Sequence, residues 1–285
     1  MAELVPTLLN GLVLGAVYVL VAVGLSLIFS VMGVVNFAHG GFLMLGAFVT
    51  WTLVTRHGTS YVVALVLSTA LVGLLGAATE RLVFRPLGAN PLHMLVASLG
   101  LAILFEEAAL IGWGAEDQAF PFASLGTVRI GEVRFPVERL GLVVPAAVII
   151  GGLWLFLKRT RLGHALRAIA QDRDAAVLQG MNPGAVNMLG FGMGTAMAGA
   201  AGSLIAPIFM VSPFMGEAPM MKAFVVVVLG GLGSLPGSVL GGLIVGVIES
   251  FGATYLGAVF QNAVSFLLLM VVVIVRPSGL LGFRE

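Results

Sequence analysis

Apolar stretches long enough to cross a lipid bilayer recur along this chain and constrain its fold more than any other feature. A spanning helix needs about 20 predominantly apolar residues to cross a hydrocarbon core of roughly 30 Å. The uninterrupted candidates are Val5–Phe29, Ala38–Thr55, Tyr61–Phe84, Leu92–Trp113, Leu140–Leu157, Val186–Ala206 and Ala258–Val275. The sequence therefore predicts an all-α polytopic membrane protein, with residues 1–285 forming one transmembrane domain.

The composition agrees with this interpretation. Hydrophobic residues make up 59% of the chain and charged residues only 9%, against about 25% charged in a soluble domain. A net charge of +1 gives no reason to expect nucleic acid as a partner. Cysteine is absent, which excludes disulfides and thiol nucleophiles. The stretch Val5–Phe29 is too long for a signal-peptide core and follows no basic residue, so we expect a permanent span.

Basic residues predict the orientation, because loops rich in lysine and arginine stay on the cytoplasmic side. The densest basic cluster lies within residues 158–173, and Arg81 and Arg85 follow the third span. Two spans separate these loops, so both are expected in the cytoplasm and the N-terminus outside. Arg276 and Arg284 place the C-terminal tail in the cytoplasm as well.

One further apolar stretch, from Pro219 to Ser250, is interrupted by glycine and proline. The interrupting residues are Gly230, Gly231, Gly233, Pro236 and Gly237. A cytoplasmic C-terminus requires an even number of crossings here. We therefore favour a hairpin that turns near Gly233–Gly237, which gives eight or nine transmembrane helices including broken or re-entrant segments.

An internal repeat with inverted topology is also predicted. When Leu9–Phe29 is aligned with Val186–Ala206, Asn10 pairs with Asn187 and the tripeptide Ser-Leu-Ile at 26–28 pairs with the same tripeptide at 203–205. The two segments cross in opposite directions in the expected topology, as an inverted repeat requires. Chance similarity between apolar helices is the alternative.

The loop over residues 158–185 is polar yet has helical periodicity. Leu162, Leu166 and Ile169 recur at spacings of four and three, and Gly180 and Pro183 mark the end of the helix. A short amphipathic helix on the cytoplasmic face would serve as a docking surface. An ordinary basic loop that contacts anionic lipid would have the same composition.

Within this loop, Asp174, Ala175, Ala176 and Gly180 resemble the EAA-x-x-x-G motif of ABC-importer permeases, with Asp in place of Glu. The surrounding GHALRAIAQDRDAAVLQGMN is similar to bacterial branched-chain amino acid permeases of the LivH type. So are GVVNFAHGGFLMLGAF, VVLGGLGSLPGSVLGGLIVG and RPSGLLG. These segments extend from residue 33 to residue 282, so the resemblance covers nearly the whole chain.

The resemblance implies a subunit of a binding-protein-dependent importer in a bacterial plasma (inner) membrane, which moves branched-chain or other small amino acids by alternating access. Its partners would be a second permease subunit, two cytoplasmic ATPase subunits and an extracytoplasmic solute-binding protein, with membrane lipid around it. The loop 158–185 would then couple the ATPases to the spans. ATP and magnesium would bind only the partner subunits, since neither Lys158 nor Lys222 lies in a P-loop.

Two glycine-rich interruptions of the spans are candidate pathway segments. One contains Asn36, His39 and Gly40, and the other contains Gly230, Gly231, Gly233 and Pro236. Irregular backbone at membrane depth is tolerated only where protein buries it or where it lines a cavity. The glycines alternatively permit only close helix crossing, and His39 alternatively lies at the membrane interface.

Glu106 and Glu107 lie inside the fourth span, and intramembrane carboxylates suggest function. They could face the pathway, pair across a subunit interface, take part in proton coupling, or extend to the interface marked by Trp113. Glu249 is expected at an interface.

Three alternatives to the amino acid importer are a proton-coupled secondary transporter, an ABC permease for urea or short amides, and a membrane-embedded enzyme. The last has least support. The four histidines show no metal-ligand spacing, and no nucleophile stands beside a base, so we predict no catalytic or metal site.

Overall fold

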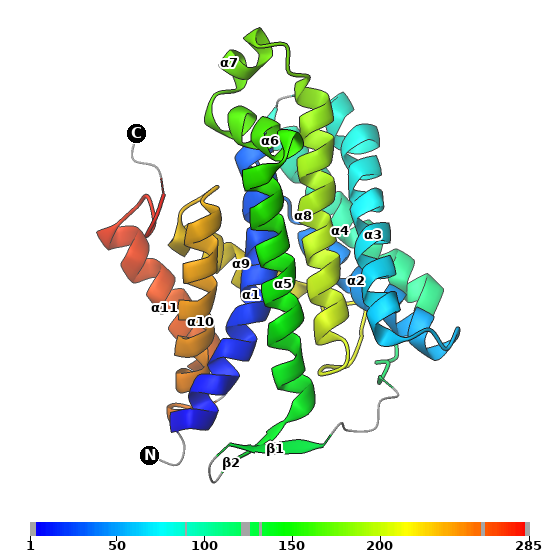
Figure 1. Ribbon diagram of the computed structural model, residues 1–285, viewed down its shortest axis with the longest axis vertical. Coiled ribbons are helices and arrows are strands. Elements are labelled where there is room, and N and C mark those ends of the chain that lie inside the picture. Colours follow the sequence, from blue (N-terminus) through cyan, green and yellow to red (C-terminus); the bar gives the residue numbers. More distant parts are fainter. Residues whose placement is uncertain (1–3, 89, 121–125, 131–132, 258–259, 283–285) are drawn as a thin grey trace.

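The computed structural model describes residues 4–88, 90–120, 126–130, 133–257 and 260–282. The chain forms an elongated bundle of helices that run roughly along one axis (Figure 1). The helices are α1 (Leu4–Met32), α2 (His39–Thr55), α3 (Tyr61–Thr79), α4 (Pro91–Trp113), α5 (Val137–Arg159), α6 (Arg161–Gln171), α7 (Arg173–Leu178), α8 (Pro183–Ile205), α9 (Glu217–Gly230), α10 (Leu235–Tyr255) and α11 (Phe260–Val275). A π-helical turn, Glu80–Phe84, and a 3₁₀ turn, Arg85–Leu87, extend α3.

Among the described residues, six helical segments are long and apolar enough to cross a membrane: α1, α3 with its extension, α4, α5, α8 and α10. Three shorter helices are also apolar: α2, the part of α11 over 263–275, and α9. The all-α polytopic fold is thus confirmed. The sequence pattern missed a short antiparallel hairpin, β1 (Thr127–Ile130) with β2 (Val133–Pro136), at the end where α1 begins.

The bundle has a central pair of helices. Most of α1 and α8 is buried, whereas α4 and α5 expose most of their surface. The central helices approach closely because glycines face each other: a Cβ on Gly24 would lie only 2.6 Å from the carbonyl oxygen of Gly194. Small residues are the usual means of close helix packing where the surroundings are as apolar as the side chains.

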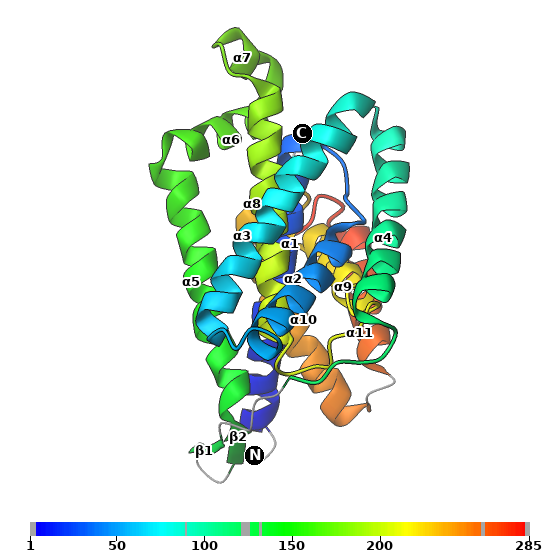
Figure 2. The ribbon, with the colours of Figure 1, turned by 90° about the vertical axis from the view of Figure 1, so that its right-hand side faces the viewer.

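The order of elements agrees with the predicted inverted repeat. In each half a long helix (α1 or α8) is followed by an irregular link, a short helix (α2 or α9) and two further helices. The two halves run in opposite directions, since α1 and α8 are antiparallel neighbours (Figures 1 and 2). The packing repeats as well, because α1 packs on α10 through Gly15, and α8 packs on α3 through Gly192, its partner in the sequence alignment.

The interrupted stretch 219–250 is a helical hairpin, as expected, but its turn is shorter than predicted. Residues 231–234 form the turn, and Pro236 and Gly237 belong to the first turn of α10. Proline fits there because the first helical N–H groups need no partner within the helix. The last predicted span begins in residues that lie outside the described ones, and α11 begins at Phe260.

Candidate functional site

The predicted coupling loop contains two helices in place of one. Asp172 ends α6 and caps α7, because its Oδ1 atom accepts a hydrogen bond of 2.9 Å from the backbone N–H of Ala175. Gly180 ends α7 with a φ of +82°, a conformation that favours glycine. Asn182 then caps α8 by accepting from the N–H of Ala185. An N-cap residue inside the amphipathic pattern is the reason that the single predicted helix is wrong.

The two short helices differ in what they contact. Leu166 and Ile169 of α6 are buried against the bundle, so α6 lies on the ends of the spans. In α7 only Ala176 is buried, and Asp174 and Ala175 are exposed. Figures 1 and 2 show α7 at the extreme end of the molecule.

The exposed face of α7 is apolar in part. Leu178 is 86% exposed and Val177 is 45% exposed, although both lie next to the small residues of the predicted motif. Val177 and Leu178 together leave an uncovered apolar surface at the tip of the molecule, where another protein can dock. The segment therefore projects from the bundle, and only residues 179–182 separate it from the central helix α8.

The first candidate pathway segment lies where the two short helices meet. His39 is the first residue of α2, and Gly40 contacts Gly216, which precedes α9. The Oδ1 atom of Asn36 accepts from the N–H of Ala38, 3.1 Å away, which positions the start of α2. His39 is completely buried with a ring nitrogen 3.1 Å from the carbonyl oxygen of Val21, so its predicted alternative place at the membrane interface is wrong.

The two glutamates of α4 separate, as adjacent residues on a helix must. Glu106 is half-buried and lies close enough to Glu217, the first residue of α9, for the two carboxylates to repel each other. Glu107 is exposed on the outer surface of the bundle. Glu106 thus belongs with the meeting point of the short helices, and Glu107 does not.

The second candidate segment lies elsewhere, at the end of the bundle near α6. Gly231 and Gly233 lie in the α9–α10 turn, with Gly230 and Pro236 on either side of it, and the turn lies against the C-terminal tail. Backbone N–H groups of Leu280 and Leu281 donate to the carbonyl oxygens of Leu229 and Gly230, at 2.8 and 3.0 Å. The C-terminal RPSGLLG segment therefore caps α9. The structure does not bring the two candidate segments together.

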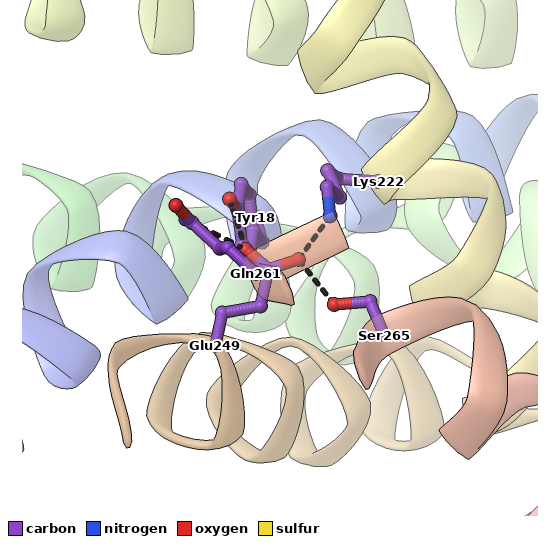
Figure 3. A network of polar contacts seen from close by, with 5 residues as sticks. All are labelled: Tyr18, Lys222, Glu249, Gln261 and Ser265. Atoms are coloured by element: carbon purple, nitrogen blue, oxygen red, sulfur yellow. Dashed lines mark hydrogen bonds and ion pairs between the residues drawn. The ribbon is translucent and has the colours of Figure 1, made fainter. Parts of the chain in front are cut away.

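A buried charged cluster escaped prediction altogether. Glu249 of α10 is 0% exposed, and its carboxylate pairs with the Nζ of Lys222 from α9. The hydroxyl of Tyr18 in α1 donates to the same carboxylate at 2.6 Å. From α11 Ser265 donates to Oε1, and Gln261 donates to Oε2 at 3.4 Å (Figure 3). Side chains from three other helices thus converge on the one carboxylate of α10, and we call these five residues the Glu249 network.

The expectation that Glu249 lies at an interface is therefore wrong. It rested on the position of Glu249 near the end of a span, but the packing of α9 on α10 places Lys222 opposite it. One signal was available in the sequence: Lys222 stands inside an apolar stretch, and a buried lysine needs an anionic partner. In the described part of the chain no group of three or more metal-ligating side chains occurs.

Comparison with known proteins identifies the family. Residues 7–275 match the family described as branched-chain amino acid transport system / permease component. The high-affinity branched-chain amino acid transport system permease protein BraD of Pseudomonas aeruginosa is 35% identical, over 98% of this chain and 95% of its own. LivH of Escherichia coli K12, with the same description, is 32% identical over 97% and 94%.

More distant similarities extend the fold beyond this family. The ribose import permease protein RbsC of Escherichia coli K12 is 26% identical over 91% of this chain and 82% of its own. A solved structure, PsaBC from Streptococcus pneumoniae in complex with Fab, aligns with a TM-score of 0.51 at 11% identity, covering 94% of this chain and 91% of that one. The full-length match, the multi-pass fold and the projecting α7 agree: the chain belongs to the permease-component family of branched-chain amino acid transport systems, whose members are transport subunits and not enzymes.

Proposed function

We propose that this chain is the membrane-spanning subunit of an ABC importer that moves leucine, isoleucine or valine into a bacterial cell across its inner membrane. The observation that supports the proposal most directly is the uncovered face of α7, with Val177 and Leu178 exposed at the tip of the bundle. A cytoplasmic ATPase subunit would seat α7, and ATP and magnesium would bind there and not in this chain. The basic residues that follow α3 and α5 lie at this same end, which supports a cytoplasmic orientation for it.

The transport step then follows from the connections of α7. Movement of the ATPases displaces α7, and α8 transmits the displacement because only a short capped link, 179–182, separates the two helices. Since α8 packs on α1, α2 and α3 through small residues, the displacement reaches the meeting point of the short helices near Gly40. A second permease subunit of a different sequence would complete the pathway, and an extracytoplasmic binding protein would supply the solute.

Uptake of labelled leucine into proteoliposomes tests the proposal. The vesicles would hold this chain, its co-purified partners and the binding protein, with ATP on the ATPase side. Uptake should require ATP, survive a protonophore and fall at least tenfold in Leu178→Glu. That side chain is almost free of contacts, so the unfolding midpoint should stay unchanged. The matched control is Leu256→Glu. It alters an exposed leucine that directly follows the C-terminal end of α10, far from α7.

The secondary transporter makes the opposite prediction. Uptake driven by a proton gradient without ATP, and lost in Glu106→Gln, would overturn the importer. Import of ribose or an amide in place of leucine would leave the coupling role of α7 in place and change only the solute.

A further inference from the structure

The cytoplasmic-side end of the bundle contains a cavity that the transport cycle described above does not use. It has a volume of about 580 Å³ and lies between the end of α1, the α3–α4 connection and the first turns of α4, α7 and α8. Sites for small molecules typically measure about 300–1,000 Å³. The cavity is therefore large enough for an amino acid.

Part of the cavity lining attracts negative charge. Arg173, at the start of α7, lines the cavity, and so does Arg85, whose guanidinium is already paired with Glu80 at 3.0 Å. The first turns of α4, at Pro91, and α8, at Gly184, contribute the positive ends of two long helices. A carboxylate is the small anionic group that this combination suits.

Another part of the lining attracts positive charge. Glu80 is 2% exposed and has a single arginine partner, Arg85, whose guanidinium also donates to the carbonyl oxygen of Gly184. The C-terminal end of α1, at Met32, adds the negative end of a third helix. Asn187 also lines the cavity and is only 8% exposed, yet its Oδ1 atom accepts no hydrogen bond. A buried acceptor without a donor is costly, so this amide has capacity for a ligand.

The remaining wall is apolar and is formed by Met32, Val34, Phe84 and Met94. A ligand that satisfies all three parts carries a carboxylate, an ammonium group and an apolar side chain. We propose that this cavity is a binding site for a zwitterionic amino acid with an aliphatic side chain, on the side of the membrane to which the solute is delivered. The identity of that side and of the solute rests on the proposed function.

Occupancy of the site has a mechanical consequence. Arg173 belongs to α7, Glu80 to the extension of α3 and Asn187 to α8. An amino acid held by all three connects the coupling helix to the bundle and restrains its movement. Solute that accumulates inside would thereby slow its own import.

Thermal unfolding of the permease–ATPase complex in nanodiscs, without nucleotide or binding protein, tests the site. Leucine should raise the unfolding midpoint in a saturable way, and Arg173→Gln should weaken binding about tenfold or more, because a charge-assisted hydrogen bond is lost. Arg173 is exposed, so this variant should fold normally. Asn187→Ala provides a second, independent variant. Arg81→Gln is the matched control. Arg81 is exposed and follows Glu80 in the sequence but does not line the cavity, so the variant removes one positive charge without changing the site.

Two analogues test the zwitterion directly. 4-Methylpentanoate lacks the ammonium group of leucine and 3-methylbutylamine lacks its carboxylate, so both should bind at least tenfold more weakly. No shift with leucine up to its solubility, equal shifts with the analogues, or equal shifts in Arg173→Gln and Asn187→Ala would overturn the inference. ATP-driven leucine uptake in proteoliposomes is read separately. Uptake without binding at this cavity refutes the inference alone, and absence of uptake refutes the proposed function.

Discussion

Replacement of Lys222 by methionine should destabilise the protein strongly, because the substitution leaves the Glu249 carboxylate buried without its cation. At an effective dielectric constant of about 20, opposite unit charges 4 Å apart attract by about 4 kcal/mol. Removal of one partner from a buried pair typically costs about 3–5 kcal/mol. The donors Tyr18, Ser265 and Gln261 stay in place but carry no net charge. We therefore expect a loss near the same 3–5 kcal/mol.

The double variant Lys222→Met/Glu249→Leu distinguishes the effect of an unpaired charge on stability from the effect of altered packing. Desolvation of two charges consumes most of their attraction, so apolar residues of similar volume often replace such a pair at little cost. We expect the double variant to regain most of the stability that Lys222→Met loses. The measurement is the unfolding midpoint of the detergent-solubilised protein, where about 1 kcal/mol corresponds to roughly 2–4 °C.

The control is Lys158→Met, which alters the other lysine of the chain. Its ammonium group lies over the ring of Trp154 at the exposed end of α5, 4.6 Å from the centroid, a contact worth about 0.5–1 kcal/mol. The reasoning is refuted if Lys222→Met shifts the midpoint no more than Lys158→Met does. It is equally refuted if the double variant unfolds as early as the single one, since the loss would then come from packing and not from an unpaired charge.

Three further outcomes are expected. Gly202→Ala should lower the unfolding midpoint by the equivalent of about 1–3 kcal/mol, because the new methyl group would overlap the backbone of Leu43; Gly100→Ala, whose surroundings are open, should raise it or leave it unchanged. Asp172→Ala should remove the cap of α7 at a cost of about 1 kcal/mol, seen as faster hydrogen exchange in residues 173–178 and slower ATP-driven uptake. Gly279→Ala should release the C-terminal tail from the end of α9, since a Cβ there would approach backbone atoms to 2.5–2.8 Å; hydrogen exchange at residues 280 and 281 reports the release.

The spans were predictable because each is encoded locally. A run of apolar residues such as Leu4–Met32 needs no information from distant residues to be recognised as a helix that crosses a membrane. The helix ends were predictable for the same reason: Gly180, Asn182 and Pro183 end one helix and begin the next. Asp172 was missed because a capping aspartate inside a periodic segment looks like any other polar position.

The charged cluster was not predictable to the same degree. Glu249 and Lys222 are distant in the sequence and meet only because α9 and α10 form a hairpin whose turn is residues 231–234. A turn two residues later, as expected from Pro236, would rotate the helices relative to one another. Tertiary position therefore decides whether a carboxylate near the end of a span lies at an interface or in the core.

The inverted repeat gives the Glu249 network a counterpart in the first half of the chain. The two halves share an arrangement of helices but differ in the side chains that join them. In the first half the short helix α2 is joined to α3 and α8 by hydroxyl groups: Thr50 donates to Ser203 at 2.7 Å, and Ser203 donates to Ser68 at 3.2 Å. In the second half the equivalent helices α9, α10 and α1 are joined by Lys222, Glu249 and Tyr18. The first set is neutral and each bond contributes about 1 kcal/mol, so it breaks and re-forms at low cost. The charged set resists separation far more strongly once water is excluded. In the proposed transport step we therefore expect α9 to stay fixed to its half of the bundle, and α2 to be the short helix that moves when α8 is displaced.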